Sequence, residues 1–425
     1  MLEVTDITLD RGVRAVVVEL LHLHTTTLTA FIKVGARFEA PEDSGLSHFV
    51  EHMLHRGTEK LPSSLALNRE FESLGGTLMA ETGRDYSSFS VSVATELVEE
   101  GLGLLGQLLS RPLFSDIELE RALVLEELTA DYDERGVELN GADIARGVVF
   151  EGHPLAQRIV GPRANVERFS RADVQRHFDT FYGARNTIVC VAGPVSATAT
   201  VDAISRAFDD QATGAPAPDS PIPPPQTGPR VKTVRDPGPQ TSIDILWRSI
   251  PETDPLYIAS LALLRVIDDG MSTRLHYRLA DQLGLAYSIS AGIEPLHDVA
   301  LFEITGATAN AKAVTLVGRS LELVGELTDN RVDPDELDKV KRRYRFELSS
   351  AIDDAPAMAS HFGATALFYP PPTLEQRAEA MENVTVDHVI EAARRIFAPD
   401  NRTVVAVGSL SPARTGELRE LVGSH

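Results

Sequence analysis

One short segment carries the residue types of a metal-dependent hydrolase: His48-Phe49-Val50-Glu51-His52. Residues four apart share one face of a helix, so both imidazoles can point at a single metal ion. Glu51 lies beside the same face. A bound metal ion lowers the pKa of its water, and a nearby carboxylate can take the proton as the water attacks. The spacing predicts a zinc hydrolase site with His48 and His52 as ligands and Glu51 as general base.

A catalytic zinc usually has three protein ligands and one open position, so a third ligand is required. An acidic helix predicted over residues 116–132 offers candidates. Glu120 and Glu127 are seven apart, about two turns, and therefore share a face. Glu126 is rotated off that face by ~100° and is expected in solvent. We predict Glu127 as the third ligand and Glu120 as the carboxylate that orients a histidine.

A bland alternative is that these residues are solvated side chains on helix surfaces, since an acidic helix in an acidic protein is often only surface. The surroundings of the histidines argue against it. Apolar residues lie before the motif, in residues 45–47, and after it, in residues 53–54. They make the predicted helix over residues 46–54 amphipathic. Such a helix would bury the histidines, and a buried histidine needs a partner, which a metal supplies.

Composition excludes several classes of protein. The chain has 425 residues, 43% hydrophobic and 24% charged, with a net charge of −22. So acidic a surface repels nucleic acids and anionic lipids. The single cysteine, Cys190, allows no internal disulfide. The first residues lack a signal-peptide pattern, and no run approaches ~18 apolar residues. We expect a cytoplasmic protein that binds neither nucleic acid nor membrane.

The predicted elements favour an α+β fold with a mostly antiparallel sheet, because strands and helices cluster rather than alternate. In the first half we expect a hairpin over 15–21 and 27–34, paired strands over 77–80 and 87–93, and helices over 46–54, 65–74, 97–109 and 116–132.

A proline-rich stretch predicts a linker over residues 213–229, between domains at 1–212 and 230–425. The halves resemble each other. Ser170 is followed by a helical pattern, then by an Asn-led β-branched strand that ends at Gly193, 23 positions after Ser170. Thr385 is followed by the same sequence of features, which ends at Gly408, again 23 positions later. This similarity predicts duplication of one α/β unit.

Several segments in order along the chain resemble the insulinase/pitrilysin family of zinc peptidases, the inverzincins of peptidase family M16. The main match is Gly45 to Leu54 followed by Arg56-Gly57-Thr58-Glu59, and further matches lie at 74–76, 120–127, 153–155, 270–275 and 284–288. The length resembles the short, two-repeat branch that includes mitochondrial processing peptidases. The resemblance implies one zinc per chain, bound by His48, His52 and Glu127, with Glu51 as general base and Glu120 in support.

The resemblance also implies a zinc endopeptidase whose two domains face a partner pair across a closed chamber that admits unfolded peptides. The partner would be a second copy or a homologous subunit. Tyr287, and Arg274 nearby, are the predicted substrate-binding residues. The sequence departs from the family at Ala280, where active members carry an arginine seven residues before that tyrosine. A second departure is Met79-Ala80, where the family often has Asn-Ala on the strand that receives the peptide.

The second half has lost the metal set. Alignment of the halves puts Val266, Gly270 and Arg345 opposite the three ligands, so the C-terminal domain is expected to be non-catalytic. An alternative function is a non-catalytic homologue that serves as a scaffold or assembly subunit. The intact Glu51 favours the enzyme, because a scaffold has no need of a general base.

Overall fold

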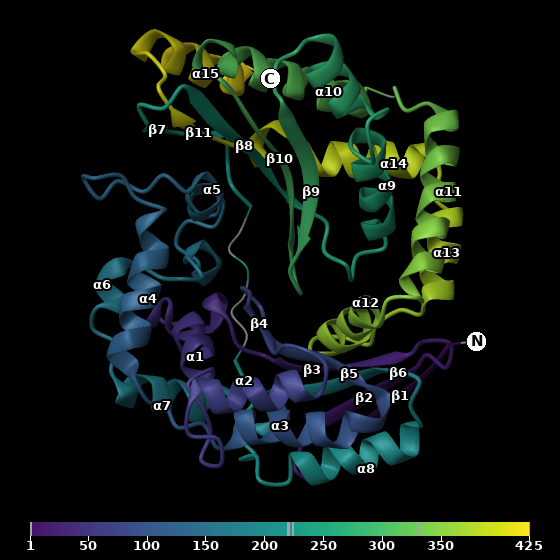
Figure 1. Ribbon diagram of the computed structural model, residues 1–425. Coiled ribbons are helices and arrows are strands. Elements are labelled where there is room, and N and C mark those ends of the chain that lie inside the picture. The colour runs from purple at the N-terminus through teal and green to yellow at the C-terminus, as the bar shows by residue number, and fades with distance from the viewer. Residues whose placement is uncertain (1, 219–221, 223–224, 330, 425) are drawn as a thin grey trace. The chain divides into compact units, whose positions relative to one another are not determined.

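The computed structural model describes residues 2–218, 222, 225–329 and 331–424, which form two compact units (Figure 1). Each unit is a sheet packed with helices, which confirms the predicted α+β class. Unit 1 comprises Met1–Leu128, Gln157–Ser220 and Leu348–Pro371, and unit 2 comprises Thr129–Ala156, Pro221–Glu347 and Pro372–His425. No helix of the described part is both long and apolar enough to cross a membrane.

The sheet of unit 1 has six strands in the order β1-β2-β6-β3-β5-β4. The strands are β1 (Glu3–Thr8), β2 (Arg14–Glu19), β3 (Thr25–Ile32), β4 (Met79–Thr82), β5 (Ser87–Ala94) and β6 (Thr187–Gly193). All neighbours are antiparallel except β2 and β6. The predicted pairing of β4 with β5 is confirmed.

The predicted hairpin of the first two buried strands is wrong. β6 lies between β2 and β3, pairing in parallel with the first and antiparallel with the second. Both strands are buried on both faces over most of their length, and such runs carry no information about which strand lies next to them. The link over residues 20–24 is long enough to pass the end of one intervening strand.

Helices cover both faces of this sheet. α3 (Val98–Ser110) and α8 (Ala197–Ala207) pack on one face. α12 (Ala355–Ala359) and the π-helix Ser360–Ala364 pack on the other, against β3 and β6 (Figure 1). The remaining helices of this unit include α1 (Leu46–Leu54), α2 (Ser64–Ser73), α4 (Ile117–Thr129), α6 (Arg163–Val166) and α7 (Arg171–Phe181).

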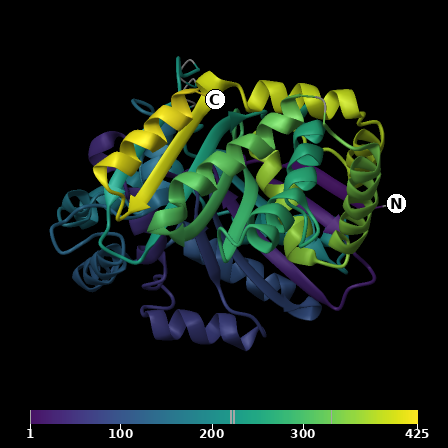
Figure 2. The same ribbon diagram turned by 90° about the horizontal axis from the view of Figure 1, so that it is seen from above.

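Unit 2 has a five-stranded sheet in the order β7-β11-β8-β10-β9. The strands are β7 (Arg230–Arg235), β8 (Gln240–Ser249), β9 (Ser288–Pro295), β10 (Ala300–Ala309) and β11 (Arg402–Gly408). α10 (Ala313–Thr328) and α14 (Val386–Ile396) pack against the sheet (Figure 2). Further helices are α9 (Tyr257–Ile267), α11 (Pro334–Ala351), α13 (Leu374–Glu382) and α15 (Pro412–Ser424).

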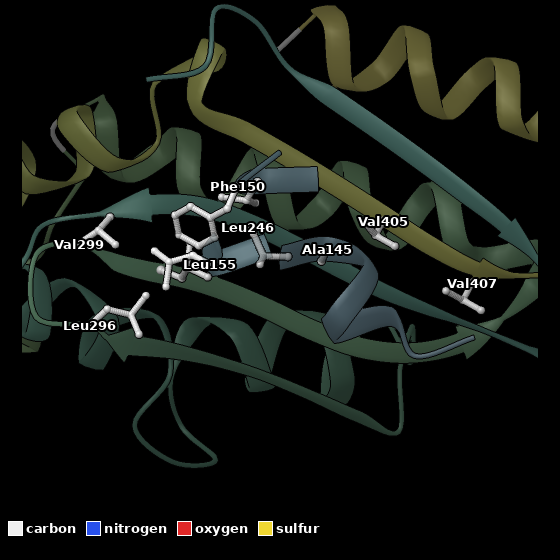
Figure 3. Packing of buried hydrophobic residues seen from close by; sticks show 10 residues of the cluster. Ala145, Phe150, Leu155, Leu246, Leu296, Val299, Val405 and Val407 are labelled. Atoms are coloured by element: carbon white, nitrogen blue, oxygen red, sulfur yellow. The ribbon is translucent and has the colours of Figure 1, made fainter. Parts of the chain in front are cut away.

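The two units exchange segments, which the sequence pattern does not indicate. α5 (Gly141–Val149) comes from the first half of the chain and packs on β8 and β11 of unit 2. Figure 3 shows apolar residues of α5, and of the segment that follows it, packed among the strands of unit 2. The buried residues of this cluster are Ala145, Val149, Phe150, Leu155, Leu246, Leu296, Val299, Leu301, Val405 and Val407. Residues 348–371 contribute to unit 1 in return.

Because of this exchange, each unit contains segments from both halves of the chain. The predicted division into a catalytic and a non-catalytic domain stays a prediction. Of the predicted linker over 213–229, residues 219–221 and 223–224 lie outside the described residues.

The repeat predicted from the sequence is present in both units. Ser170 caps α7 and Thr385 caps α14, each in a capping box and each with φ −106° and ψ 165°. The strands that follow, β6 and β11, are buried along their whole length. The duplicated unit therefore keeps the same local geometry in both copies.

The exchanged segment 348–371 gives a direct test of packing in unit 1. A methyl group added to Gly363 would lie 2.4 Å from Cε2 of Phe31 and 2.8 Å from Cβ of Cys190. We expect Gly363→Ala to destabilise the unit by about 1–3 kcal/mol through overpacking, measured by urea unfolding. The control is Gly325→Ala on α10, where the methyl meets nothing within 4 Å. Equal unfolding midpoints for the two variants would contradict this packing.

Candidate metal centre

The helix that carries the histidines has an unusual start. α1 begins after Gly45, which must be glycine because its φ is 96° and because an added Cβ would lie 2.5 Å from the Val160 carbonyl oxygen. No side chain at that position caps the helix. The carboxylate of Glu39 caps it instead, accepting bonds from the backbone N–H groups of Gly45 (2.8 Å) and Ser47 (2.6 Å). Burial raises the pKa of Glu39 to about 8, although these two bonds lower it.

The apolar face of α1 fixes its rotation. Phe49, Val50 and Met53 are fully buried. The same rotation leaves the rings of His48 and His52 together, with centroids 4.6 Å apart and side chains 12% and 27% exposed. The predicted boundaries of this helix, residues 46–54, agree with the structure.

The three predicted ligands converge from two helices. On α4, Oε2 of Glu127 lies 3.8 Å from Nε2 of His48 and 3.8 Å from Nε2 of His52. One ligand atom from each residue lies within 4.8 Å of the other two, and in the described part of the chain no other histidine, cysteine or carboxylate group meets that criterion. Glu126 is exposed and outside this group.

The donor set fits zinc. Tetrahedral zinc with ~2.0–2.1 Å bonds needs ligand atoms ~3.3 Å apart, and each imidazole nitrogen lies 3.8 Å from the Glu127 oxygen, so small side-chain shifts would close the site around the ion. Burial, with the nearby His52, lowers the pKa of His48 to about 3, so its imidazole is neutral, the form that binds metals. Its Nδ1 is buried without a partner among the described residues, which leaves no competing bond to turn the ring. Three protein donors leave a position for water or substrate.

Glu120 is hydrogen-bonded to the second histidine. Its side chain is 5% exposed, and Oε2 lies 3.1 Å from Nδ1 of His52, which directs Nε2 towards Glu127. Burial alone would raise the pKa of Glu120, but the bond to His52 and the charge of Arg56 outweigh it and lower the pKa. Burial likewise opposes the charge on His52, but Glu120 raises the pKa of that imidazole overall.

Sequence analysis missed Arg56, whose guanidinium donates to the other oxygen of Glu120. The spacing gave a signal, because Arg56 follows His52 by four residues, although the structure places it in the turn after α1. The arginine keeps Glu120 ionised in a buried place, and an ionised carboxylate is the better acceptor for the imidazole N–H.

Glu51 is held from a neighbouring strand. The hydroxyl of Thr82, on β4, donates a hydrogen bond to Oε2 of Glu51. Burial raises the pKa of Glu51, which the bond from Thr82 partly offsets. A carboxylate with a raised pKa is suited to accept a proton and give it back near neutral pH. Thr82 was also missed, since nothing in the sequence links a strand residue to a helix residue 31 positions away.

The predicted substrate-binding residues lie in unit 2. Tyr287 is fully exposed directly before β9. The side chain of Arg274 is 8% exposed, and it donates to both carboxylate oxygens of Glu336 and to the carbonyl of Arg331. These bonds argue for a structural role of Arg274, and contact with substrate stays a prediction for both residues.

Comparison with known proteins places this centre in a family. The family model described as insulinase, peptidase family M16, matches residues 15–163, which include the three predicted ligands. The model described as the peptidase M16 inactive domain matches residues 168–344. The chain belongs to peptidase family M16.

Relatives and solved structures agree with this membership. A Rickettsia felis protein described as an uncharacterized zinc protease is 25% identical over 401 residues, covering 92% of this chain and 94% of its own. A probable mitochondrial-processing peptidase subunit beta of Arabidopsis thaliana is 27% identical, covering 95% and 78%. The crystal structure of a protease from Helicobacter pylori has a TM-score of 0.88 at 19% identity, covering 96% of this chain and all of that one. That likeness shows the fold.

The ligand assignment is testable through neighbouring glutamates. We expect His48→Ala, His52→Ala and Glu127→Ala each to weaken zinc binding by more than the ~10–100-fold typical of residues that only orient ligands. Glu126→Ala is the matched control, because its carboxylate is exposed one position away. Titration against a chromophoric chelator measures the affinities. Equal losses for Glu126→Ala and Glu127→Ala would overturn the assignment.

Proposed function

We propose that the chain is a zinc-dependent endopeptidase that cleaves unfolded peptides. The observation that carries the proposal is the meeting of two imidazole nitrogens and the Glu127 carboxylate beside a second, separately held carboxylate. A metal-binding protein without activity needs only the first three groups. Membership of a peptidase family and the relatives named zinc protease support the same reaction class.

His48, His52 and Glu127 would hold the zinc ion, which polarises the scissile carbonyl and lowers the pKa of water. Glu51 then accepts the proton as the water attacks the carbonyl carbon. The same carboxyl group returns that proton to the leaving amine nitrogen, so that the peptide bond breaks and Glu51 is ready for another cycle. Glu120 keeps the ring of His52 in the ligating tautomer throughout.

A non-catalytic scaffold is the competing function, and the surroundings of Glu51 argue against it. Its carboxylate is largely withdrawn from solvent, which costs stability unless something offsets it. A scaffold gains nothing from a partly buried acid beside a metal centre. A general base gains a raised pKa.

We further propose that the active form is a dimer enclosing a chamber, either of two copies or of this chain with a homologous subunit. The name of the Arabidopsis relative, a subunit beta, supports a second kind of subunit. Ala280, where the family arginine is expected, supports it too, because the partner would then supply the missing guanidinium.

Replacement of Glu51 separates catalysis from metal binding. Glu51→Gln keeps the shape and all three ligands, so we expect zinc content to stay the same. Without a proton acceptor, kcat should fall by at least ~10²–10⁴-fold. A quenched fluorescent peptide and metal analysis measure the two effects. Glu126→Gln, an exposed acid, is the control. Near-native cleavage by Glu51→Gln would exclude its role as base.

The dimer proposal predicts that activity follows assembly. Sedimentation of the purified chain, combined with cleavage assays, should assign activity to dimers and none to monomers. If the homodimer is weak, Ala280→Arg should raise its activity by restoring the arginine that the family places before Tyr287. A fully active monomer would refute the chamber. No gain from Ala280→Arg would mean that other residues hold the substrate.

A further inference from the structure

Thr82 connects the sheet of unit 1 to α1, the helix that carries the two histidines and is called the metal helix below. It is the last residue of β4, which forms one edge of the six-stranded sheet and pairs with β5 among the described strands. Its side chain is buried, with 8% of the residue exposed, and its hydroxyl donates to Oε2 of Glu51 on α1. A carboxylate oxygen that receives this bond is held in place, and the other oxygen is left to accept a proton.

The turn after Thr82 is anchored independently. The backbone N–H groups of Ala36 and Arg37 donate to the carbonyls of Gly83 (3.2 Å) and Arg84 (3.1 Å). The Arg37 guanidinium also pairs with Asp85 at 2.8 Å, with side chains only 1% and 5% exposed. A buried pair of this kind is strongly destabilising when one partner is lost, so it fixes the geometry of the turn.

The same short segment also holds the start of α1. Glu39 follows Arg37 by two residues and caps the helix through Gly45 and Ser47. Residues 35–39 therefore bind the turn after β4 through the Arg37 side chain and the first turn of the metal helix through the Glu39 side chain. Thr82 and Glu51 meet between these two fixed points, so the position of the hydroxyl is set by both elements and not by a flexible side chain.

We propose that Thr82 is a positioning residue for Glu51, holding its carboxylate in the orientation that proton transfer requires. The inference rests on the proposed peptidase function and adds to it a residue outside the metal-binding segments. The hydroxyl suits this role because a carboxylate can only accept, and a threonine in a strand has few rotamers to lose.

The test compares two substitutions at one position. Thr82→Val keeps the shape and removes the donor, whereas Thr82→Ser keeps the donor. We expect Thr82→Val to lower kcat by about 10–100-fold, the loss of one hydrogen bond to a charged group. KM should change by less than about threefold and zinc content not at all. Thr82→Ser should recover most of the wild-type kcat. Thr82→Ala replaces Thr82→Val if the valine variant does not fold.

A purely structural role is separated by two controls. Thr29→Val removes a buried hydroxyl of the same sheet that bonds Ser90 instead of Glu51, so it should change stability without lowering kcat. In a Glu51→Gln background, Thr82→Val should cost little further activity, because it acts through Glu51. If the wild type cleaves peptide and Thr82→Val matches it, the inference is overturned and the proposed function stands. A zinc-loaded wild type that does not cleave peptide, either as a homodimer or with a homologous subunit that carries the arginine, would refute both.

Discussion

The buried carboxylate of Glu39 determines where the metal helix begins, and the geometry of the centre depends on it. α1 is only nine residues long, too short to be stable by itself, and it starts at a left-handed glycine that provides no cap. Two backbone N–H groups at its buried end would otherwise lack partners, at a cost of about 1–3 kcal/mol each. Satisfying them from residue 39 fixes the register of the helix, and the positions of His48, Glu51 and His52 follow from that register.

Three carboxylates near the centre are distinguished by their surroundings. Glu120 is buried but bonded to Arg56 and His52, which lowers its pKa and keeps it a permanent acceptor. Glu51 has a hydroxyl donor but no cation bonded to it among the described residues, and burial raises its pKa. Glu127 is the most exposed, at 48% of its side chain, and faces two imidazoles. One side-chain type thus meets three different environments, which suit the predicted roles of orienting group, proton carrier and ligand.

The ligand set could be predicted from the sequence because it depends on local periodicity. Spacings of four and seven residues decide which side chains share a helix face, and the meeting of His48, His52 and Glu127 agrees with that arithmetic. Thr82, Glu39 and the strand order of unit 1 depend on pairings between distant segments, which periodicity does not encode. The packing of α5 in unit 2 could not be predicted for a similar reason. Its apolar face predicts that the helix is buried, but not which sheet covers it.

The two sources of ligands are constrained to different degrees. Both histidines lie on α1, which is held at its start by Glu39 and past its end by the bond from Arg56 to Glu120. Glu127 lies near the end of α4, one residue before the chain leaves unit 1 at Leu128 and continues into the segment that supplies α5. The histidine pair is therefore preorganised, whereas the carboxylate comes from a helix end with fewer local restraints. Within this fold, the local restraints act on the two imidazoles of the predicted centre and on Glu51 between them, whereas the predicted carboxylate ligand, Glu127, is exposed.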